Sequence, residues 1–361
     1  MVAPTARQAL LLLVLALVVS ASEATPQQSV PAAIPTPTIV AGLPPAQRVG
    51  STFRNLDPDY RRAPLLTRAR SLILGGTWLV GERRVAALPT ATPDLKTLRD
   101  NSSRATVTWV GHSTLLVHLD GVNFLTDPTW ASRSGPLSGL VGVTRYTPPA
   151  IAFDDLPRID FVLISHDHYD HLDEPTVRRL ARTFNPRFVV PLGIKKWLED
   201  HGITNVVELN WGESVNIAGV TVVCTPAQHG SGRTLVDQGR RLWASWAVLG
   251  SKRFYFAGDT GYYRHFQDIG KALGPFDLAA LPIGSYTPRV LAQPVHMSPE
   301  EALQAWLDLR ATKFLGIHWG TFALAREPYD EPPRRIAEEV ERRHLDSDSV
   351  WILKPGATTA W

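Results

Sequence analysis

The chain has 361 residues, of which 44% are hydrophobic, and its formal net charge is +3 at pH 7. This apolar content is enough for a large core, and the length does not require a second domain. Because the charge excess is small and no long run of Lys or Arg is present, we do not expect the chain to bind nucleic acid. The single cysteine, Cys224, excludes an internal disulfide.

The N-terminus has the composition of an export signal. Residues 9–19 form a short, charge-free apolar run, and residues 22–24 (Ser-Glu-Ala) fit a small-x-small cleavage pattern. We therefore predict a signal peptide over residues 1–24 and an exported protein, with an uncleaved segment that anchors the chain to a membrane as the alternative. Residues 25–50, rich in Pro, Ala and Thr, are predicted to form an extended or disordered linker. One domain is expected over residues 51–361.

Strand and helix patterns follow along the rest of the chain. Asp120-Gly121 is typical of a tight hairpin turn between two strands. Residues 298–301 (Ser-Pro-Glu-Glu) form a capping box with Pro at the first helical position. Strands are predicted at residues 105–110, 114–119, 122–126, 159–164, 187–191, 206–209, 214–217, 220–225, 243–249, 253–258, 278–282, 313–317 and 350–354, and helices at residues 174–183, 193–201, 299–310 and 333–344.

One stretch, residues 165–173, reads Ser-His-Asp-His-Tyr-Asp-His-Leu-Asp. It follows the apolar, β-branched run at residues 159–164, which predicts a buried strand, and it precedes a helix pattern opened by Pro175. The stretch therefore lies on a loop that leaves a buried strand. The alternative is a surface loop that is rich in His and Asp by chance, but packing seldom needs so many metal-binding groups in one place.

The spacing within this loop suits metal binding. Alternate side chains of an extended segment point to the same side, so His166 and His168 can hold one metal ion while Asp170 and His171 point towards a second. Imidazole and carboxylate ligands suit Zn²⁺, with Fe and Mn as alternatives. Two metal ions need further ligands, which must come from other strand ends.

Three further groups of this kind, His229, Asp259 and His318, each follow an apolar strand pattern. Each is a weak indication by itself, because a lone His after a strand is more often a hydrogen-bonded structural residue and an Asp before Thr-Gly is often part of a turn. Together with the first motif they supply the ligands of a two-metal site.

The order H-x-H-x-D-H, then His, Asp and His, resembles that of the metallo-β-lactamase superfamily. Six segments are similar in detail to its branch of N-acyl-phosphatidylethanolamine-hydrolysing phospholipases D. This resemblance implies an α/β fold in which two sheets lie between helices, the αββα metallo-β-lactamase sandwich, with a single catalytic domain. The segments are residues 109–114, 125–128, 243–246, 256–262, 274–280 and 317–324.

Carried over position by position, the resemblance implies two zinc ions held by histidines and aspartates. The ligands of the first ion would be His166, His168 and His229, those of the second Asp170, His171 and His318, and Asp259 would bridge the two.

The resemblance also adds two catalytic candidates to Asp259. Asp127, in a Thr-Asp-Pro segment, is expected to orient a ligating histidine, with a cap or turn role as the alternative. His296 is expected to contact the substrate or the leaving group rather than a metal. The chain departs from the family pattern at Gly230, where a tryptophan follows the ligating histidine, so we expect the substrate channel to differ in shape.

The implied activity is that of a zinc-dependent phosphodiesterase. A metal-bound water has a pKa lowered to about 7, and a bridging hydroxide would attack phosphorus. The expected reaction converts N-acyl-phosphatidylethanolamine-type phospholipids at a membrane surface into N-acylethanolamine and phosphatidic acid. The loop residues Leu137, Leu140 and Val141 are candidates for contact with lipid. A homodimer is compatible with this expectation.

Two alternatives remain open from the sequence. One is another hydrolase on the same fold, either a lactonase or a phosphodiesterase of broad specificity. The other is a non-catalytic exported protein that binds lipid or metal. The complete set of ligands argues against the second, because degenerate relatives usually lose a ligand.

Overall fold

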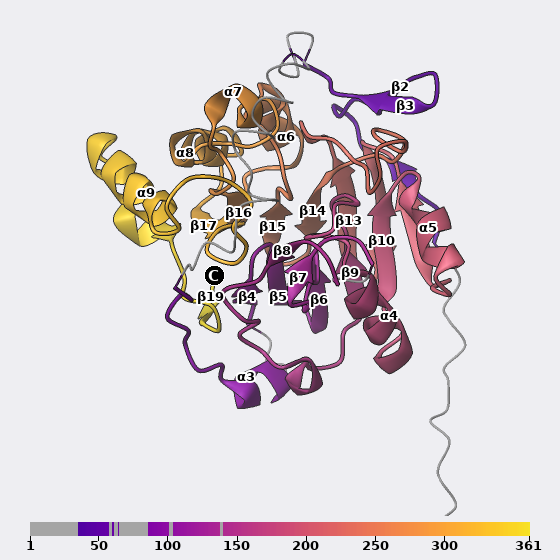
Figure 1. Ribbon diagram of the computed structural model, residues 1–361, viewed down its shortest axis with the longest axis horizontal. Helices are drawn as coiled ribbons and strands as arrows, with labels where there is room; N and C mark the ends of the chain where they lie inside the picture. The colour runs from indigo at the N-terminus through magenta and orange to yellow at the C-terminus, as the bar shows by residue number, and fades with distance from the viewer. Residues whose placement is uncertain (1–34, 58–59, 61–63, 65–85, 101–103, 138–139) are drawn as a thin grey trace, which may run out of the picture. The chain divides into compact units, whose positions relative to one another are not determined.

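The computed structural model describes residues 35–57, 60, 64, 86–100, 104–137 and 140–361 (Figure 1). The predicted signal peptide lies outside these residues, as does the first part of the predicted linker. Within the described ranges, no helix combines the length and the apolar character that crossing a bilayer requires.

Two mixed β-sheets form the centre of the fold. The larger sheet has eight strands, in the spatial order β1 (Thr38–Ile39), β12 (Glu213–Ile217), β13 (Val220–Thr225), β14 (Ser245–Leu249), β15 (Arg253–Phe256), β16 (Leu278–Pro282), β17 (Lys313–Ile317) and β18 (Val350–Trp351). The smaller sheet has seven, in the order β11 (Val206–Leu209), β10 (Arg187–Pro191), β9 (Phe161–Leu163), β6 (Val122–Thr126), β5 (Thr114–Leu119), β4 (Thr106–Gly111) and β19 (Thr358–Ala360). Two short hairpins pair β2 (Gln47–Val49) with β3 (Thr52–Arg54) and β7 (Arg133–Ser134) with β8 (Val143–Thr144).

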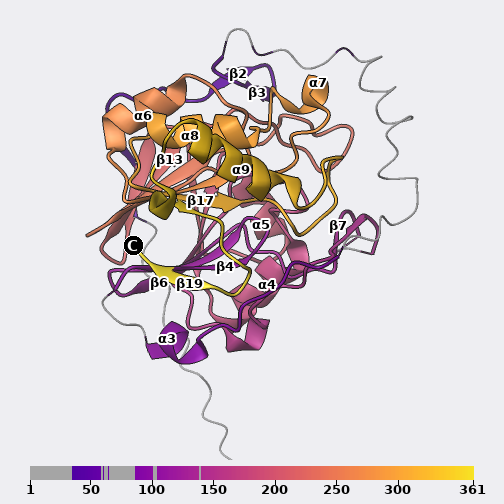
Figure 2. The same ribbon diagram turned by 90° about the vertical axis from the view of Figure 1, so that its left-hand side faces the viewer.

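Helices cover the outer faces of both sheets. Figure 2 shows α6, α8 and α9 on one side of the two sheets and α3 and α4 on the other. This is the αββα arrangement, so the predicted fold class is confirmed. The helices are α3 (Leu95–Asp100), α4 (Glu174–Thr183), α5 (Ile194–Asp200), α6 (His265–Leu273), α7 (Arg289–Ala292), α8 (Pro299–Asp308) and α9 (Glu331–Arg342), with 3₁₀ turns at Phe153–Asp155 and Ser347–Ser349.

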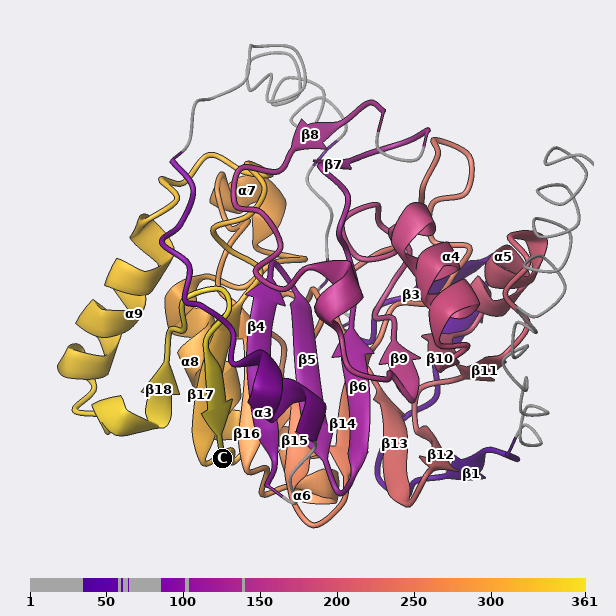
Figure 3. The ribbon, with the colours of Figure 1, turned by 90° about the horizontal axis from the view of Figure 1, so that it is seen from below.

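An apolar core fills the space between the sheets, which lie one behind the other in Figure 3. Phe124 and Phe161 of the smaller sheet stack with ring centroids 4.5 Å apart, and Phe254 of the larger sheet lies 5.8 Å from Phe124. A second apolar cluster, which includes Val162 and Leu180, lies between the smaller sheet and α4 and α5. Because β9 and β10 are buried on both faces, they appear in the sequence as nearly continuous apolar runs.

Most of the predicted elements lie close to their expected positions. Helix α8 begins with the predicted capping box, in which the Ser298 hydroxyl accepts a hydrogen bond from the Glu301 N–H and the Glu301 carboxylate accepts one from the Ser298 N–H. The strand expected at 350–354 is limited to Val350–Trp351. Helices α3, α6 and α7 and strands β1, β2, β3, β7, β8 and β19 were not predicted.

Residues 35–50, the described part of the predicted linker, pack against the larger sheet. Ile39 lies in β1, which pairs antiparallel with the edge strand β12. Leu43 is buried in the main core. Residues 34–361 form one compact unit by their internal contacts, so this segment packs with the rest of the domain.

Candidate metal centre

The predicted ligands lie at one edge of the two sheets, because the chain leaves five strands there. The loop that carries His166 follows β9, and Asp127 follows β6 of the same sheet. His229, Asp259 and His318 follow β13, β15 and β17 of the larger sheet. The centre is therefore built from both sheets, and each loop starts from a buried, hydrogen-bonded strand that fixes its position.

His166, His168 and His229 form the first group of facing ligand atoms. Nε2 of His166 lies 2.8 Å from Nδ1 of His168, and Nε2 of His229 lies 3.2 Å from the same Nδ1 atom. The three ligand atoms lie within 4.8 Å of one another. This is the set that the sequence predicted for the first metal ion.

Asp170, His171 and His318 form the second group. Oδ2 of Asp170 lies 3.2 Å from Nε2 of His171 and 3.5 Å from Nε2 of His318. All three residues are buried. This group matches the set predicted for the second metal ion.

Asp259 lies between the two groups. Its Oδ2 atom is 3.2 Å from Nε2 of His171 and 3.8 Å from Nε2 of His229, while its Oδ1 atom is 3.1 Å from Nε2 of His318. The carboxylate thus faces ligands of both groups, which is the placement expected for a bridging group.

The ligand atoms of the cluster are better suited to binding metal ions than to forming hydrogen bonds with one another. Nε2 of His171, Nε2 of His318 and Oδ1 of Asp259 are buried and have no hydrogen-bond partner among the described residues. Leaving such atoms unpaired costs about 1–3 kcal/mol each, and metal coordination would satisfy them. The buried His/Asp cluster is therefore consistent with a dinuclear metal site.

The protonation state of His166 and His229 also suits metal binding. Burial, together with the neighbouring imidazole of His171, lowers the pKa of His166 well below its usual value, and burial likewise lowers the pKa of His229. Both rings are therefore neutral at pH 7, which is the state that binds metal.

Asp127 contacts a predicted ligand, and it also belongs to a group with His166 and His171 that could hold a metal ion. Its Oδ1 atom accepts a hydrogen bond from the Ser165 N–H at 2.7 Å, and its Oδ2 atom accepts one from the Ser165 hydroxyl at 2.5 Å. The same Oδ2 atom lies 2.7 Å from Nδ1 of His171. With Nδ1–H bonded to this carboxylate, Nε2 of His171 is left as the ligand atom, as the sequence predicted for a carboxylate that orients a histidine.

His296 lies beside the centre. Its Nδ1 atom is 3.9 Å from Oδ2 of Asp259 and has no hydrogen-bond partner within the described part of the chain, and its ring centroid is 5.1 Å from that of His229. Its position is compatible with the predicted contact to substrate, and Nδ1 also belongs to a group with His229 and Asp259 that could hold a metal ion.

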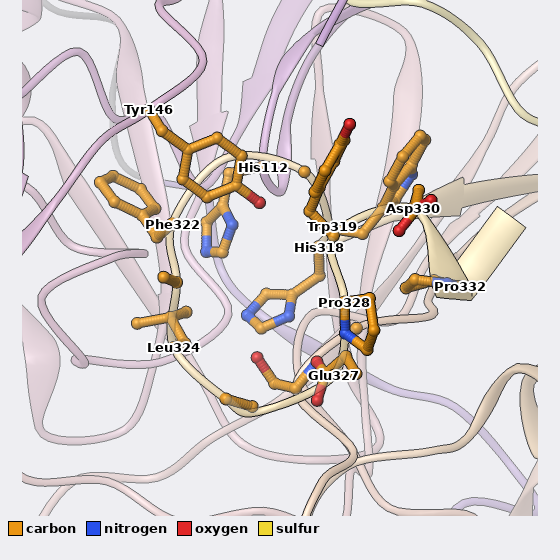
Figure 4. Close-up of a pocket in the computed structure, with 16 residues that line it drawn as sticks. His112, Tyr146, His318, Trp319, Phe322, Leu324, Glu327, Pro328, Asp330 and Pro332 are labelled. Atoms are coloured by element: carbon orange, nitrogen blue, oxygen red, sulfur yellow. The ribbon is translucent and has the colours of Figure 1, made fainter. Parts of the chain in front are cut away.

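The sequence did not identify His112 as part of the site. This residue follows β4, is buried, and places Nε2 at 3.0 Å from Oδ2 of Asp170, while its backbone oxygen accepts a hydrogen bond from the His318 N–H. Figure 4 shows the rings of His112 and His318 side by side, and their centroids are 4.2 Å apart. The Gly-His-Ser segment at the end of a strand was the available signal, and His112 is also a potential ligand.

Asn55 was missed as well. Its side-chain N–H donates to the backbone oxygen of His229 at 2.8 Å, and its oxygen accepts hydrogen bonds from the His229 N–H at 3.0 Å and from the Trp243 indole N–H at 3.0 Å. One amide side chain thus fixes the main chain of a predicted ligand. No local pattern in the sequence marks this role.

The loop that starts at Gly230, where a departure from the resembling pattern was expected, is tied to the histidine motif through Asp167. The Gly232 N–H and the Arg241 guanidinium donate hydrogen bonds, each of 2.7 Å, to the two carboxylate oxygens of Asp167. Arg233 adds hydrogen bonds to the backbone oxygens of Asp167 and Leu172. These hydrogen bonds from the loop therefore hold residues 166–171 in position.

Comparison with known proteins agrees with this geometry. Residues 122–319 match the family model described as a beta-lactamase superfamily domain. The chain is 46% identical over 259 residues to the N-acyl-phosphatidylethanolamine-hydrolyzing phospholipase D 1 of Caenorhabditis elegans, covering 68% of this chain and 72% of that protein. An uncharacterized protein of Mycobacterium tuberculosis is 43% identical over 316 residues, covering 84% and 81%. Among solved structures, a metallo hydrolase from Ignicoccus hospitalis aligns with a TM-score of 0.55 and 27% identity, over 71% of this chain and 98% of that one.

Proposed function

The chain belongs to the metallo-β-lactamase superfamily, and from this membership we propose that it is a zinc-dependent phosphodiesterase that hydrolyses N-acyl-phosphatidylethanolamine-type phospholipids. The fold and its complete His/Asp cluster make it a metal-dependent hydrolase. The observation that carries the finer proposal is the 46% identity to a relative whose name states this activity, combined with a full set of ligands.

Three exposed apolar residues support a lipid substrate. Leu137, Leu140 and Val141, in the segment between β7 and β8, have exposed fractions of 70%, 80% and 54%. Exposed apolar side chains on one loop are typical of an interaction site. We propose that this loop contacts the lipid surface and that the protein acts outside the cytoplasm, as its N-terminal apolar run predicts.

Two metal ions, when bound, would supply Lewis-acid stabilisation of the phosphoryl oxygens and an activated water. The residues of the chain orient the ligands and contact the substrate. Asp127 holds His171 in the orientation that presents Nε2, and Asp259 faces both metal positions. Burial lowers the pKa of His296 to about 4, so its ring is neutral at pH 7 and can donate one N–H hydrogen bond to the substrate.

Mass spectrometry of vesicles that contain N-acyl-phosphatidylethanolamine tests the proposal. The zinc-loaded protein should release N-acylethanolamine and phosphatidic acid, and Asp259→Ala should release neither. Asp268→Asn, a partly exposed carboxylate on α6, is the matched control and should retain activity.

Parallel assays with a sugar lactone and a small chromogenic phosphodiester separate this activity from its alternatives. Cleavage of the lactone without cleavage of the lipid would refute the proposal. Equal lipid turnover by wild type and Asp259→Ala would indicate that the centre is not catalytic.

A further inference from the structure

A cavity of about 240 Å³ opens directly beside the metal centre (Figure 4). His112 and His318 form one part of its wall. The remainder comes from the chain after β16, from the loop between β17 and α9, and from Tyr146. Of the residues at the metal centre, His112 and His318 belong to its lining, so the cavity adjoins the group of Asp170, His171 and His318.

The cavity is rigidly joined to the metal centre. The Ile283 N–H donates to the backbone oxygen of Ile317, and the next residue, Gly284, passes so close to His318 that a Cβ atom there would lie 2.3 Å from the His318 oxygen. Ser285 follows with a φ of 63°, a left-handed conformation that is rare for a residue with a side chain. Such backbone conformations are concentrated at functional sites.

A carboxylate, that of Glu327, lines the cavity. Its oxygens accept hydrogen bonds from the backbone N–H groups of Ser285 at 2.6 Å and Thr287 at 3.2 Å. Burial raises the pKa of Glu327. Among the residues that the structure describes, no Lys or Arg forms an ion pair with it, so its remaining lone pairs can accept a hydrogen bond from a ligand.

The hydroxyl of Tyr146 is the complementary group. Burial and the nearby Glu327 carboxylate raise the pKa of Tyr146, so it remains a neutral O–H donor at any physiological pH. Its backbone N–H donates to the oxygen of Thr321, which fixes it to the loop after β17. Glu327 and Tyr146 thus supply an acceptor and a donor, the pair that a secondary amide requires, within a lining that also includes Ser285, Tyr329 and Asp330.

The volume and the lining residues of the cavity further limit which ligands can bind in it. A volume of about 240 Å³ is below the usual range for a whole drug-sized ligand. An acylated ethanolamine unit fits this space, whereas a full acyl chain does not. Trp319, Phe322 and Leu324 provide apolar walls along which a chain can leave.

We propose that this cavity is the leaving-group subsite and that Glu327 and Tyr146 recognise the amide of an N-acylated amino alcohol, Glu327 accepting from the amide N–H and Tyr146 donating to the amide carbonyl. This inference rests on the proposed function, which supplies the hydrolytic reaction. It adds that the protein recognises the amide group of the substrate. The protein therefore discriminates an amide from an ester in the leaving group.

The test compares two short-chain ligands that differ only in this group. N-hexanoylethanolamine and 2-hydroxyethyl hexanoate, in which an ester oxygen replaces the N–H, are titrated calorimetrically into the metal-loaded protein. The amide should bind at least about tenfold more tightly, because the ester leaves the Glu327 carboxylate unpaired. Glu327→Gln should reduce this preference to less than about threefold, since the Gln oxygen would accept from the backbone N–H groups and its NH2 would face the ligand N–H as a second donor.

Tyr146→Phe serves as a second variant and should weaken amide binding without affecting the loop that Glu327 holds. Glu338→Gln, an exposed residue on α9 that pairs with Arg334, is the matched control and should leave the preference unchanged. Equal binding of amide and ester by wild type, or an equal loss of both in Glu327→Gln, would overturn the inference. Tighter binding of protonated ethanolamine than of the amide would also overturn it, because the cavity would then be a cation site.

The outcomes separate this inference from the proposed function, because the titration needs no turnover. Lipid hydrolysis without amide preference would leave the proposed function standing and refute the subsite. Amide preference without lipid hydrolysis would support the subsite and refute the proposed function.

Discussion

Asp127 determines which nitrogen of His171 is available, so a substitution that keeps its shape should still damage the centre. In Asp127→Asn, an amide nitrogen can replace the oxygen that faces Nδ1 of His171. The histidine would then carry its proton on Nε2, the atom predicted to bind metal. We expect zinc affinity to fall about 10–100-fold, measured by competition with a chelating dye. Unchanged affinity would show that Asp127 has only the alternative turn role.

Asn55 allows a sharper test, because it contacts only one of the two ligand groups. Asn55→Ala removes its three hydrogen bonds, two to the main chain of His229 and one to Trp243. The group of His166, His168 and His229 should bind its metal ion more weakly, while the group around His318 should keep its affinity for metal. Elemental analysis should find the metal content falling from two ions towards one per chain. Loss of both ions together would instead indicate general unfolding.

At the scale of residues, the sequence predicts the ligand residues better than the residues that hold them in place. All seven predicted ligands come together, because they lie on loops that follow four recognisable apolar strands. His112 was missed although the Gly-His-Ser segment at a strand end was a signal, and Asn55 was missed because its partner, His229, lies far away in the chain. Such contacts depend on which strand ends are neighbours, and a single sequence does not contain that information.

At the scale of elements, the errors have physical causes. Helix α6 contains Gly270, which weakens a helix pattern, yet a Cβ atom there would lie 2.2 Å from the backbone oxygen of Asp308. The glycine permits close approach of α6 to the end of α8. Strand β19 pairs with β4, about 250 residues earlier, in which Thr358 lies opposite Thr108. A three-residue strand formed by such a distant partner has no local signature.

Helix α9 gives a prediction on pH. Hydrogen bonds from Arg342, together with Arg343, lower the pKa of Glu339 from 4.5 to about 2. Because the folded-state pKa is depressed, the stabilisation is fully present at neutral pH and is lost as the pH falls from about 4.5 through about 2. Glu339→Gln should lower the free energy of unfolding by about 1 kcal/mol at pH 7. In urea denaturation this difference should shrink at pH 4; a difference that is constant with pH would contradict the assignment.

For the whole molecule, the centre lies where the two sheets meet. The smaller sheet supplies Asp127 and the loop with residues 166–171, and the larger sheet supplies His229, Asp259 and His318. At this edge of the sheets, buried polar and charged side chains from one sheet face those from the other. Bound metal ions would therefore connect the two sheets as well as serve the chemistry.

This arrangement predicts that metal removal destabilises the entire domain and not the site alone. A ligand that binds only the folded state adds about 2.7 kcal/mol at 100 times its dissociation constant and about 4.1 kcal/mol at 1,000 times. Chelation should also leave Nε2 of His171 and Oδ1 of Asp259 buried without partners. We expect a clear fall in Tm on treatment with EDTA, restored by added zinc, with hydrogen exchange rising in the loops of both sheets around the centre. Equal Tm values with and without metal, or faster exchange in one sheet only, would show that the metal ions do not join the two sheets.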